Sequence, residues 1–131
     1  MTVDLVPSIR ETGLPLIEIA IAGKRHLFIL DTGASANLIS GTLKDSVDHT
    51  PAGEATSYSF EGNVVDCPMV RLSYSVGGDS HEASFTVTDP STFEVFMEES
   101  GLEVVGIMGI PFLIEHKCVV DFCVGSLTLI A

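Results

Sequence analysis

Basic residues are scarce in this sequence. Lys and Arg number 6 against 18 Asp and Glu, so the formal net charge is −12 and the pI is near 4.4. Proteins that bind nucleic acid or anionic membranes need Lys and Arg to displace the counterions around phosphate groups. We therefore expect no nucleic-acid partner, no membrane partner and an acidic surface that repels other copies of itself.

The sequence also lacks a long apolar run and a recognisable leader. Its best apolar stretch, residues 104–114, is interrupted by Gly106, Gly109 and Pro111, and is too short to span a bilayer. The first residues contain neither the basic region nor the long apolar segment of a signal peptide. We expect a cytoplasmic protein, although a leader trimmed from the chain would leave no trace in it.

Cysteines are few, and their number is odd. Any intramolecular pairing of Cys67, Cys118 and Cys123 leaves one thiol free, which favours reduced thiols in a reducing compartment. The run from His116 to Cys118, followed by Cys123, has no standard zinc spacing and no fourth ligand. We expect no metal and no cofactor, and we interpret the cysteines as buried apolar side chains.

What the sequence does contain favours a mostly β fold. Hydrophobic residues make up 46% of the chain, and 12 Gly and 6 Pro are spread along it, as in proteins of many short strands. Ser91 and Glu94 have the spacing of a capping box, and Gly101 is suited to end the helix that they begin. Strands are predicted at 14–22, 26–30, 55–65 (a pair that turns at 61–63), 69–76, 82–87, 104–108, 117–122 and 126–130, and helices at 91–100 and 110–116.

Two helices are too few to connect the strands of a parallel α/β sheet. The pattern therefore predicts a small, irregular β-barrel with one or two short helices. We interpret residues 1–13 as an N-terminal arm and residues 14–131 as a single domain.

The stretch from Leu27 to Ser35 combines an apolar strand with an acid. Four apolar residues lead directly to Asp31, and small residues follow it. An ionised carboxylate at the end of a buried strand is costly unless donors surround it, and the backbone N–H groups of Thr32 and Gly33 are suited to that role. Asp-Thr-Gly is also an ordinary β-turn sequence, but the preceding apolar residues place this carboxyl at the mouth of a core.

Two motifs in this order resemble those of aspartic peptidases of the single-domain, retropepsin-like class. FILDTGASANLIS (28–40) resembles the catalytic loop, and VVGIMGIPFLIEHKCVVDFCVGSLTLI (104–130) resembles the apolar-apolar-Gly step, short helix and closing hairpin. The resemblance implies a retropepsin-like closed barrel. It also implies that Asp31 is the catalytic acid/base, that the Thr32 hydroxyl links two catalytic loops, and that the Gly33 N–H holds the carboxylate.

The same resemblance implies where substrate binds. In that class, Ile107-Met108-Gly109 passes behind the catalytic loop, and glycine is required because the two backbones nearly touch. The flap corresponds to residues 57–65, with Gly62 near its tip. The residues expected to line the substrate site are Ala34, Phe60, Gly62, Met108 and Gly109.

Aspartic-peptidase chemistry needs two carboxylates that share a proton, and this sequence contains Asp-Thr-Gly only once. The second carboxylate is therefore expected from an identical chain, related by a two-fold axis. Ile110-Pro111 stand where retroviral enzymes commonly have an arginine that braces the dimer, so the dimer contacts are expected to differ. We expect a homodimeric aspartic endopeptidase acting on peptide or protein substrates. The alternative is a non-proteolytic dimeric binding or scaffolding module that keeps the fold.

Other catalytic constellations find little support. The segment from Gly33 to Asn37 lacks the second glycine of a nucleophile elbow, and no glycine-rich phosphate loop is present. The histidines are expected at the surface or at strand edges; they are His26, His49, His81 and His116.

Overall fold

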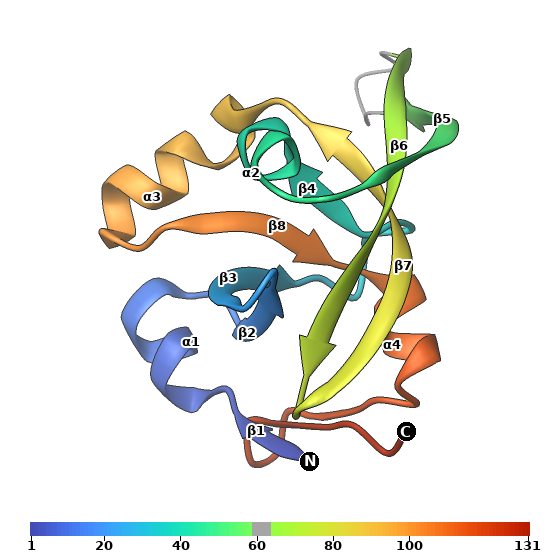
Figure 1. Cartoon of the computed structure of the whole chain (residues 1–131). Coiled ribbons are helices and arrows are strands. Elements are labelled where there is room, and N and C mark those ends of the chain that lie inside the picture. The colour runs from blue at the N-terminus through green and yellow to red at the C-terminus, as the bar shows by residue number, and fades with distance from the viewer. Residues whose placement is uncertain (59–63) are drawn as a thin grey trace.

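The computed structural model describes residues 1–58 and 64–131. Short strands dominate the chain, and short helices lie between them (Figure 1). In chain order the elements are β1 (Thr2–Asp4), α1 (Val6–Thr12), β2 (Leu16–Ile21), β3 (Lys24–Leu30), β4 (Leu38–Ser40), α2 (Gly41–Ser46), β5 (Thr50–Tyr58), β6 (Val64–Val76), β7 (Asp79–Thr88), the 3₁₀ helix η1 (Pro90–Phe93), α3 (Glu94–Ser100), β8 (Val104–Met108), α4 (Ile110–Glu115), β9 (Val119–Asp121) and β10 (Ser126–Thr128).

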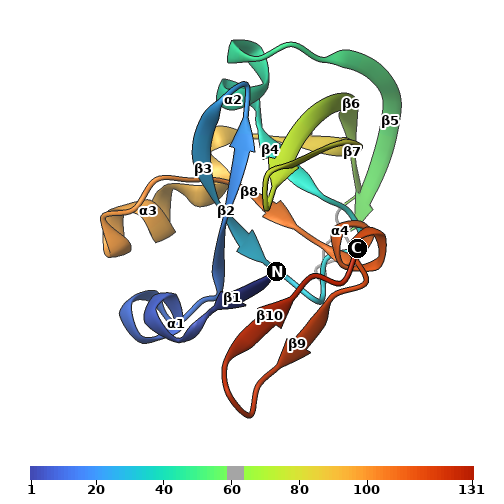
Figure 2. The same ribbon diagram turned by 60° about the horizontal axis from the view of Figure 1, so that its bottom comes forward.

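Six of the strands close into a barrel. Their order is β2-β3-β8-β4-β7-β6, and a pairing of Ala20 on β2 with Ser75 on β6 joins the two ends. Strand β5 continues the sheet beyond β6, and a separate sheet contains β1, β10 and β9. Figure 2 shows the β9–β10 hairpin projecting from the barrel. The predicted mostly β, retropepsin-like closed barrel is confirmed.

Alternation of side chains along the strands builds the core. On β2, Ile17, Ile19 and Ile21 are buried while Glu18 between them is exposed, as the pleat of a strand requires. The long β6–β7 hairpin turns at Gly77 and Gly78, whose positive φ values of 63° and 88° suit a two-residue turn. The largest fully buried apolar side chains are those of Leu5, Ile19, Phe28, Ile39, Phe85, Val104, Met108, Phe112 and Leu127.

Helices are more numerous than the one or two that the sequence predicted. Helix α1 has Pro7 in its first turn and ends at Gly13, whose φ of 81° forms a left-handed cap. Ser40 caps the start of helix α2: its Oγ accepts a hydrogen bond from the Leu43 N–H at 3.2 Å. Neither helix spans more than two turns, so neither repeats an apolar pattern often enough to be recognised.

The start of the third helical segment also differs from the prediction. Its cap is Asp89, whose carboxylate accepts a hydrogen bond from the Ser91 N–H at 2.9 Å, so the capping box of Ser91 and Glu94 was wrong. This hydrogen bond lowers the pKa of Asp89 below its ordinary value. The end was predicted correctly, since Gly101 adopts φ 72° after α3.

The N-terminal segment packs against the terminal hairpin. Strand β1 pairs with β10, with Val3 opposite Leu127. Leu5 is only 1% exposed, and its N–H donates to the Gly125 carbonyl at 2.8 Å. Residues 1–13, which were expected to form an arm, therefore contribute both a strand and a core side chain.

His116 lies in the core, so its predicted place at the surface was wrong. It is 1% exposed, and both ring nitrogens are hydrogen-bonded. Because Nδ1 faces the Ala131 carbonyl, it must donate, and Nε2 of a neutral ring then accepts from the Tyr74 hydroxyl at 2.7 Å. Burial, reinforced by the Glu115 and Cys118 charges, raises the pKa of Tyr74 to about 12. This polar pair ties β6 to the end of α4.

The cysteines are unpaired, but they are not all buried. Cys67 and Cys118 are half-buried, whereas Cys123 is exposed, which contradicts its predicted burial. Burial raises the pKa of the Cys118 thiol. Within the described residues, no helix has both the length and the apolar character needed to cross a membrane.

Candidate active site

Asp31 directly follows Leu30, the last residue of the barrel strand β3. Strand β3 is flanked by β2 on one side and by the parallel strand β8 on the other, with Leu30 opposite Met108. The Asp31 N–H continues this pairing by donating to the Met108 carbonyl at 3.0 Å. Leu30 is buried and Asp31 is half-buried, so the carboxylate stands at the boundary between the core and solvent.

A tight turn holds the Asp31 carboxylate. Its Oδ1 accepts a hydrogen bond from the Gly33 N–H at 2.8 Å, and its backbone carbonyl accepts one from the Ala34 N–H at 3.2 Å. A Cβ atom at position 33 would lie 3.3 Å from Oδ1, so a side chain would crowd the carboxylate. The structure thus gives Gly33 the donor role that the sequence assigned to it.

Hydrogen bonds from the end of β8 hold the Asp31 loop (residues 31–37) in place. The Ile110 N–H donates to the Ala34 carbonyl at 2.8 Å, and the Gly109 N–H donates to Asn37 Oδ1 at 3.0 Å. A Cβ atom at position 109 would lie 2.5 Å from the Ala36 carbonyl oxygen and 2.6 Å from that of Ala34. Only glycine allows the two backbones to approach this closely.

Asn37 is a site residue that the sequence reasoning missed. It is 2% exposed, its side chain accepts from Gly109, and its carbonyl accepts from the Thr86 N–H at 2.8 Å. It therefore joins the Asp31 loop to both the end of β8 and β7. A signal was present, because an amide inside the small and apolar run from Ala34 to Ile39 needs a buried partner.

The expected site residues fall into three groups. Asp31, Thr32, Gly33 and Ala34 share one turn, in which Thr32 and Gly33 are exposed. Met108 is fully buried and Gly109 is buried behind the loop, so both support the loop, and their contact with substrate stays a prediction. Phe60 and Gly62, with the expected flap tip, lie outside the described residues.

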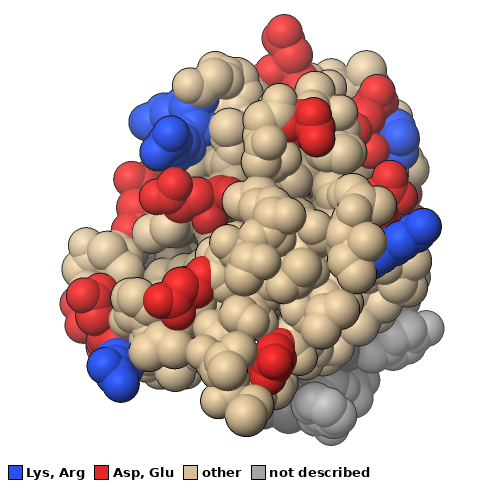
Figure 3. All heavy atoms as spheres, turned by 90° about the horizontal axis from the view of Figure 1, so that it is seen from below, with Lys and Arg blue, Asp and Glu red and all other residues tan. Residues whose placement is uncertain are grey.

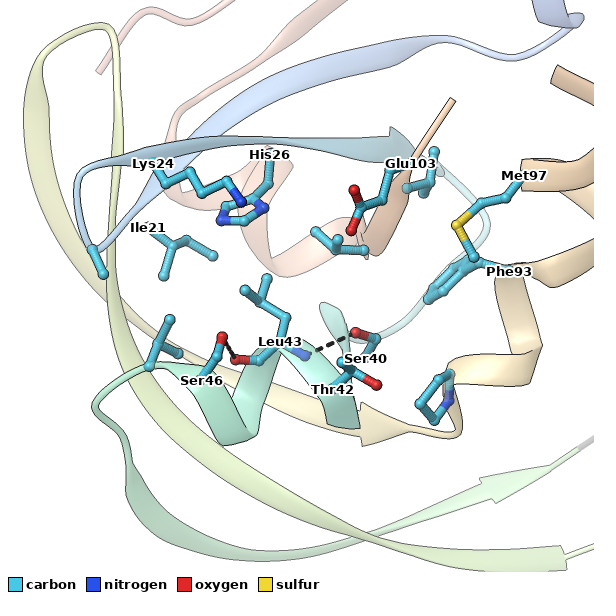
Figure 4. A pocket seen from close by; sticks show the side chains of 15 residues that line it. Ile21, Lys24, His26, Ser40, Thr42, Leu43, Ser46, Phe93, Met97 and Glu103 are labelled. Atoms are coloured by element: carbon cyan, nitrogen blue, oxygen red, sulfur yellow. Dashed lines mark hydrogen bonds between the residues drawn. The ribbon is translucent and has the colours of Figure 1, made fainter. Parts of the chain in front are cut away.

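A hollow of about 430 Å³ lies elsewhere, between α2, η1, α3 and the starts of β3 and β8. Figure 4 shows Lys24, His26 and Glu103 on one of its sides and Leu43 and Ser46 on the other. Burial, helped by the Lys24 charge, lowers the pKa of His26. No residue of the Asp31 turn lines this hollow, so it is separate from the catalytic turn.

The geometry supplies one fixed carboxylate and no metal-binding cluster. Within residues 1–58 and 64–131, no three His, Cys, Asp or Glu side chains converge as metal ligands. A carboxylate held by a backbone N–H is suited to accept or donate one proton at a time. A reaction that needs an acid and a base at once requires a second group beside it.

Substituting Gly109 tests the close approach of the two backbones. The change Gly109→Ala is expected to destabilise the fold by about 1–3 kcal/mol or more, because its Cβ meets backbone oxygens that cannot move independently. Urea denaturation measures this loss. Gly41→Ala is the matched control: it places a Cβ 3.7 Å from the nearest atom, the Thr88 carbonyl oxygen, and should be nearly neutral. Equal stability of the two variants would contradict the steric account.

Comparison with known proteins supports this interpretation of the site. The family model described as "Aspartyl protease" matches residues 17–112, a span that runs from β2 into α4 and contains both the Asp31 turn and Gly109. A search of curated proteins found no significant match. The matched span covers well over half of the chain and agrees with the retropepsin-like resemblance of its motifs. The chain therefore belongs to the aspartyl protease family.

Proposed function

We propose that this protein is an aspartic endopeptidase whose catalytic pair consists of Asp31 from each of two identical chains. The observation that carries the proposal is the Asp31 turn, in which the Gly33 N–H holds a half-buried carboxylate at the end of a barrel strand. The family match supports a peptidase in general terms. The participation of two chains is our inference.

The proposed reaction uses one proton shared between the two carboxylates. The ionised Asp31 takes a proton from a water molecule whose oxygen attacks the peptide carbonyl carbon, while the protonated Asp31 donates a hydrogen bond to the carbonyl oxygen. The tetrahedral intermediate then collapses: its carbonyl re-forms, the C–N bond breaks, and the departing nitrogen receives the proton that the first carboxylate took from water. The pH dependence would report two apparent pKa values that belong to the pair.

The need for a second chain follows from the single Asp-Thr-Gly in the sequence. A two-fold axis beside the Asp31 turn would bring the two carboxylates together. The exposed Thr32 hydroxyl is free of the core and suited to contact the partner's loop.

The distribution of exposed apolar side chains supports an interface near the C-terminal part of the chain. Phe122, at the β9–β10 turn, is 77% exposed. Large apolar side chains that are poorly covered are concentrated from α4 to the end of the chain: Ile110, Ile114, Val119, Phe122, Val124 and Ile130. Figure 3 shows the centre of the face seen from below as largely free of charged side chains. Apolar surface of this kind is typical of protein contacts.

The backbone of the hairpin supports the same interface. Strand β9 pairs with β10 on one side, and no strand of the described chain pairs with its other edge. An open edge offers N–H and C=O groups to a partner strand, and two β9 strands related by a two-fold axis would pair antiparallel.

Replacing the catalytic acid tests the peptidase proposal. Asp31→Asn keeps an oxygen for the Gly33 N–H but cannot exchange a proton, so cleavage of a peptide mixture should fall by roughly 10²- to 10⁴-fold. Cleavage by the unchanged protein should be sensitive to pepstatin from about pH 4 to 7. The control Asp79→Asn, an exposed acid on β7, should cleave normally. Absence of inhibitor-sensitive cleavage in the unchanged protein would favour the non-proteolytic module instead.

A charge placed on the hairpin tests the interface. Phe122→Glu should weaken self-association by at least about tenfold, because like charges facing each other across an interface cost several kcal/mol. Sedimentation equilibrium measures the change, and cleavage activity should fall with the dimer fraction. The matched control is Val95→Glu on α3, which is 67% exposed and lies away from the hairpin. If both variants associate as the unchanged protein does, the hairpin is not the interface.

A further inference from the structure

A second hollow lies beneath α1, apart from the Asp31 turn. It measures about 390 Å³, within the range of ligand-binding pockets. Its floor is apolar: Leu16, Leu127 and Leu129 are buried in it, and Leu27 and Leu102 line it while remaining half-buried. None of its lining residues belongs to the segment 31–37 or to the end of β8, so it is independent of the catalytic turn.

The charged side chains that line this hollow are all acidic. They are Asp4, Glu11 and Glu18, and no Lys or Arg is among the lining residues. Met1 also lines the hollow, and its N-terminal ammonium donates to the Leu129 carbonyl at 3.2 Å. Figure 3 shows acidic side chains gathered beside a hollow on the left of the face seen from below. Asp4 accepts a hydrogen bond from the Val6 N–H, and Glu18 lies 3.7 Å from Arg25, with both side chains largely exposed. Three carboxylates therefore face two cations, Arg25 and the Met1 ammonium, so the rim keeps a net negative charge.

The combination of an apolar floor and an acidic rim selects its ligand. An apolar side chain gains free energy by leaving water for the floor, while the rim attracts a cation and repels an anion. The hollow below α2 differs, because Lys24 and Glu103 line it together and offer no such preference. A second copy of this chain is a poor occupant of this hollow, because it has only 6 basic residues to offer an acidic rim.

We propose that the hollow beneath α1 binds a peptide segment of another protein in which apolar side chains alternate with or adjoin Lys or Arg. The apolar side chain packs on the part of the floor that contains Leu16, Leu27 and Leu102. The cation lies against Glu11 and Glu18 on the rim. This site would hold a substrate or partner at a distance from the catalytic turn. It does not depend on catalysis, since it shares no residue with the Asp31 site.

Binding of short fluorescein-labelled peptides tests the proposal by fluorescence polarisation. The Asp31→Asn protein is used so that no peptide is cleaved, which also separates this test from that of the peptidase proposal. An alternating Leu–Lys peptide should bind saturably, and it should bind more tightly than a Ser–Lys peptide or a Leu–Glu peptide. Amide chemical-shift changes should be concentrated on α1, β2, β3 and the loop at Leu102.

Two variants locate the interaction. Glu11→Gln combined with Glu18→Gln should weaken binding of the Leu–Lys peptide by roughly three- to tenfold, because the change removes two rim charges without altering shape. The matched control, Glu98→Gln combined with Glu99→Gln, removes two exposed charges from α3 and should leave the affinity unchanged. Leu102→Asn should abolish the preference for Leu–Lys over Ser–Lys, with circular dichroism confirming the fold.

Three results would overturn the proposal. Equal weakening in the two double variants, or equal binding of Ser–Lys and Leu–Lys peptides, would show general attraction to an acidic surface. Chemical-shift changes centred outside the hollow would place the peptide elsewhere. Shifts at the hollow that grow with protein concentration in the absence of peptide would make a second copy the occupant.

Discussion

The approach of the Gly109 backbone to the 34–37 loop is the contact on which the site depends. It allows three hydrogen bonds to cross between the end of β8 and the Asp31 loop: from Asp31 to Met108, from Ile110 to Ala34, and from Gly109 to the Asn37 side chain. Without them, the loop would be an unsupported turn on the rim of the barrel. With them, the loop takes its position from the strands, and the Asp31 carboxylate takes its position from the loop. A reactive group held by rigid elements in this way can be placed accurately against a partner.

Charge and apolar surface act in opposite directions on the proposed pairing of two chains. Two copies that each carry −12 repel each other, and in salt this repulsion acts only within about a Debye length. Apolar contact must therefore supply the association, and the exposed side chains from α4 through the β9–β10 hairpin offer it. The same acidic surface has a different consequence beneath α1, where it borders an apolar floor and favours a cationic ligand. The acidic composition thus opposes the association of two chains at one surface and favours a cationic ligand at the other.

The sequence predicted those features that depend on local patterns. Apolar runs and turn residues located most strands to within a few residues. The family resemblance placed Gly109 behind the Asp31 loop, where the structure also has it. Features that depend on distant contacts were missed. The hydrogen-bond partner of Asn37 is identified only once β8 lies beside it, and that of His116 only once Tyr74 lies against its ring. Met108 was expected to line the substrate site as part of the 107–109 step, and in the structure its side chain lies in the core. Helices α1 and α2 are too short to show a period, and their stability comes from caps and from packing against the barrel.

The most direct test of the account is the dependence of specific activity on enzyme concentration, measured together with the solution mass over the same range. A site built from Asp31 of two chains predicts that peptide cleavage per chain is proportional to the fraction of chains in dimers, and that it vanishes upon dilution to monomers. Full activity per chain at concentrations where sedimentation finds only monomers would contradict the shared site.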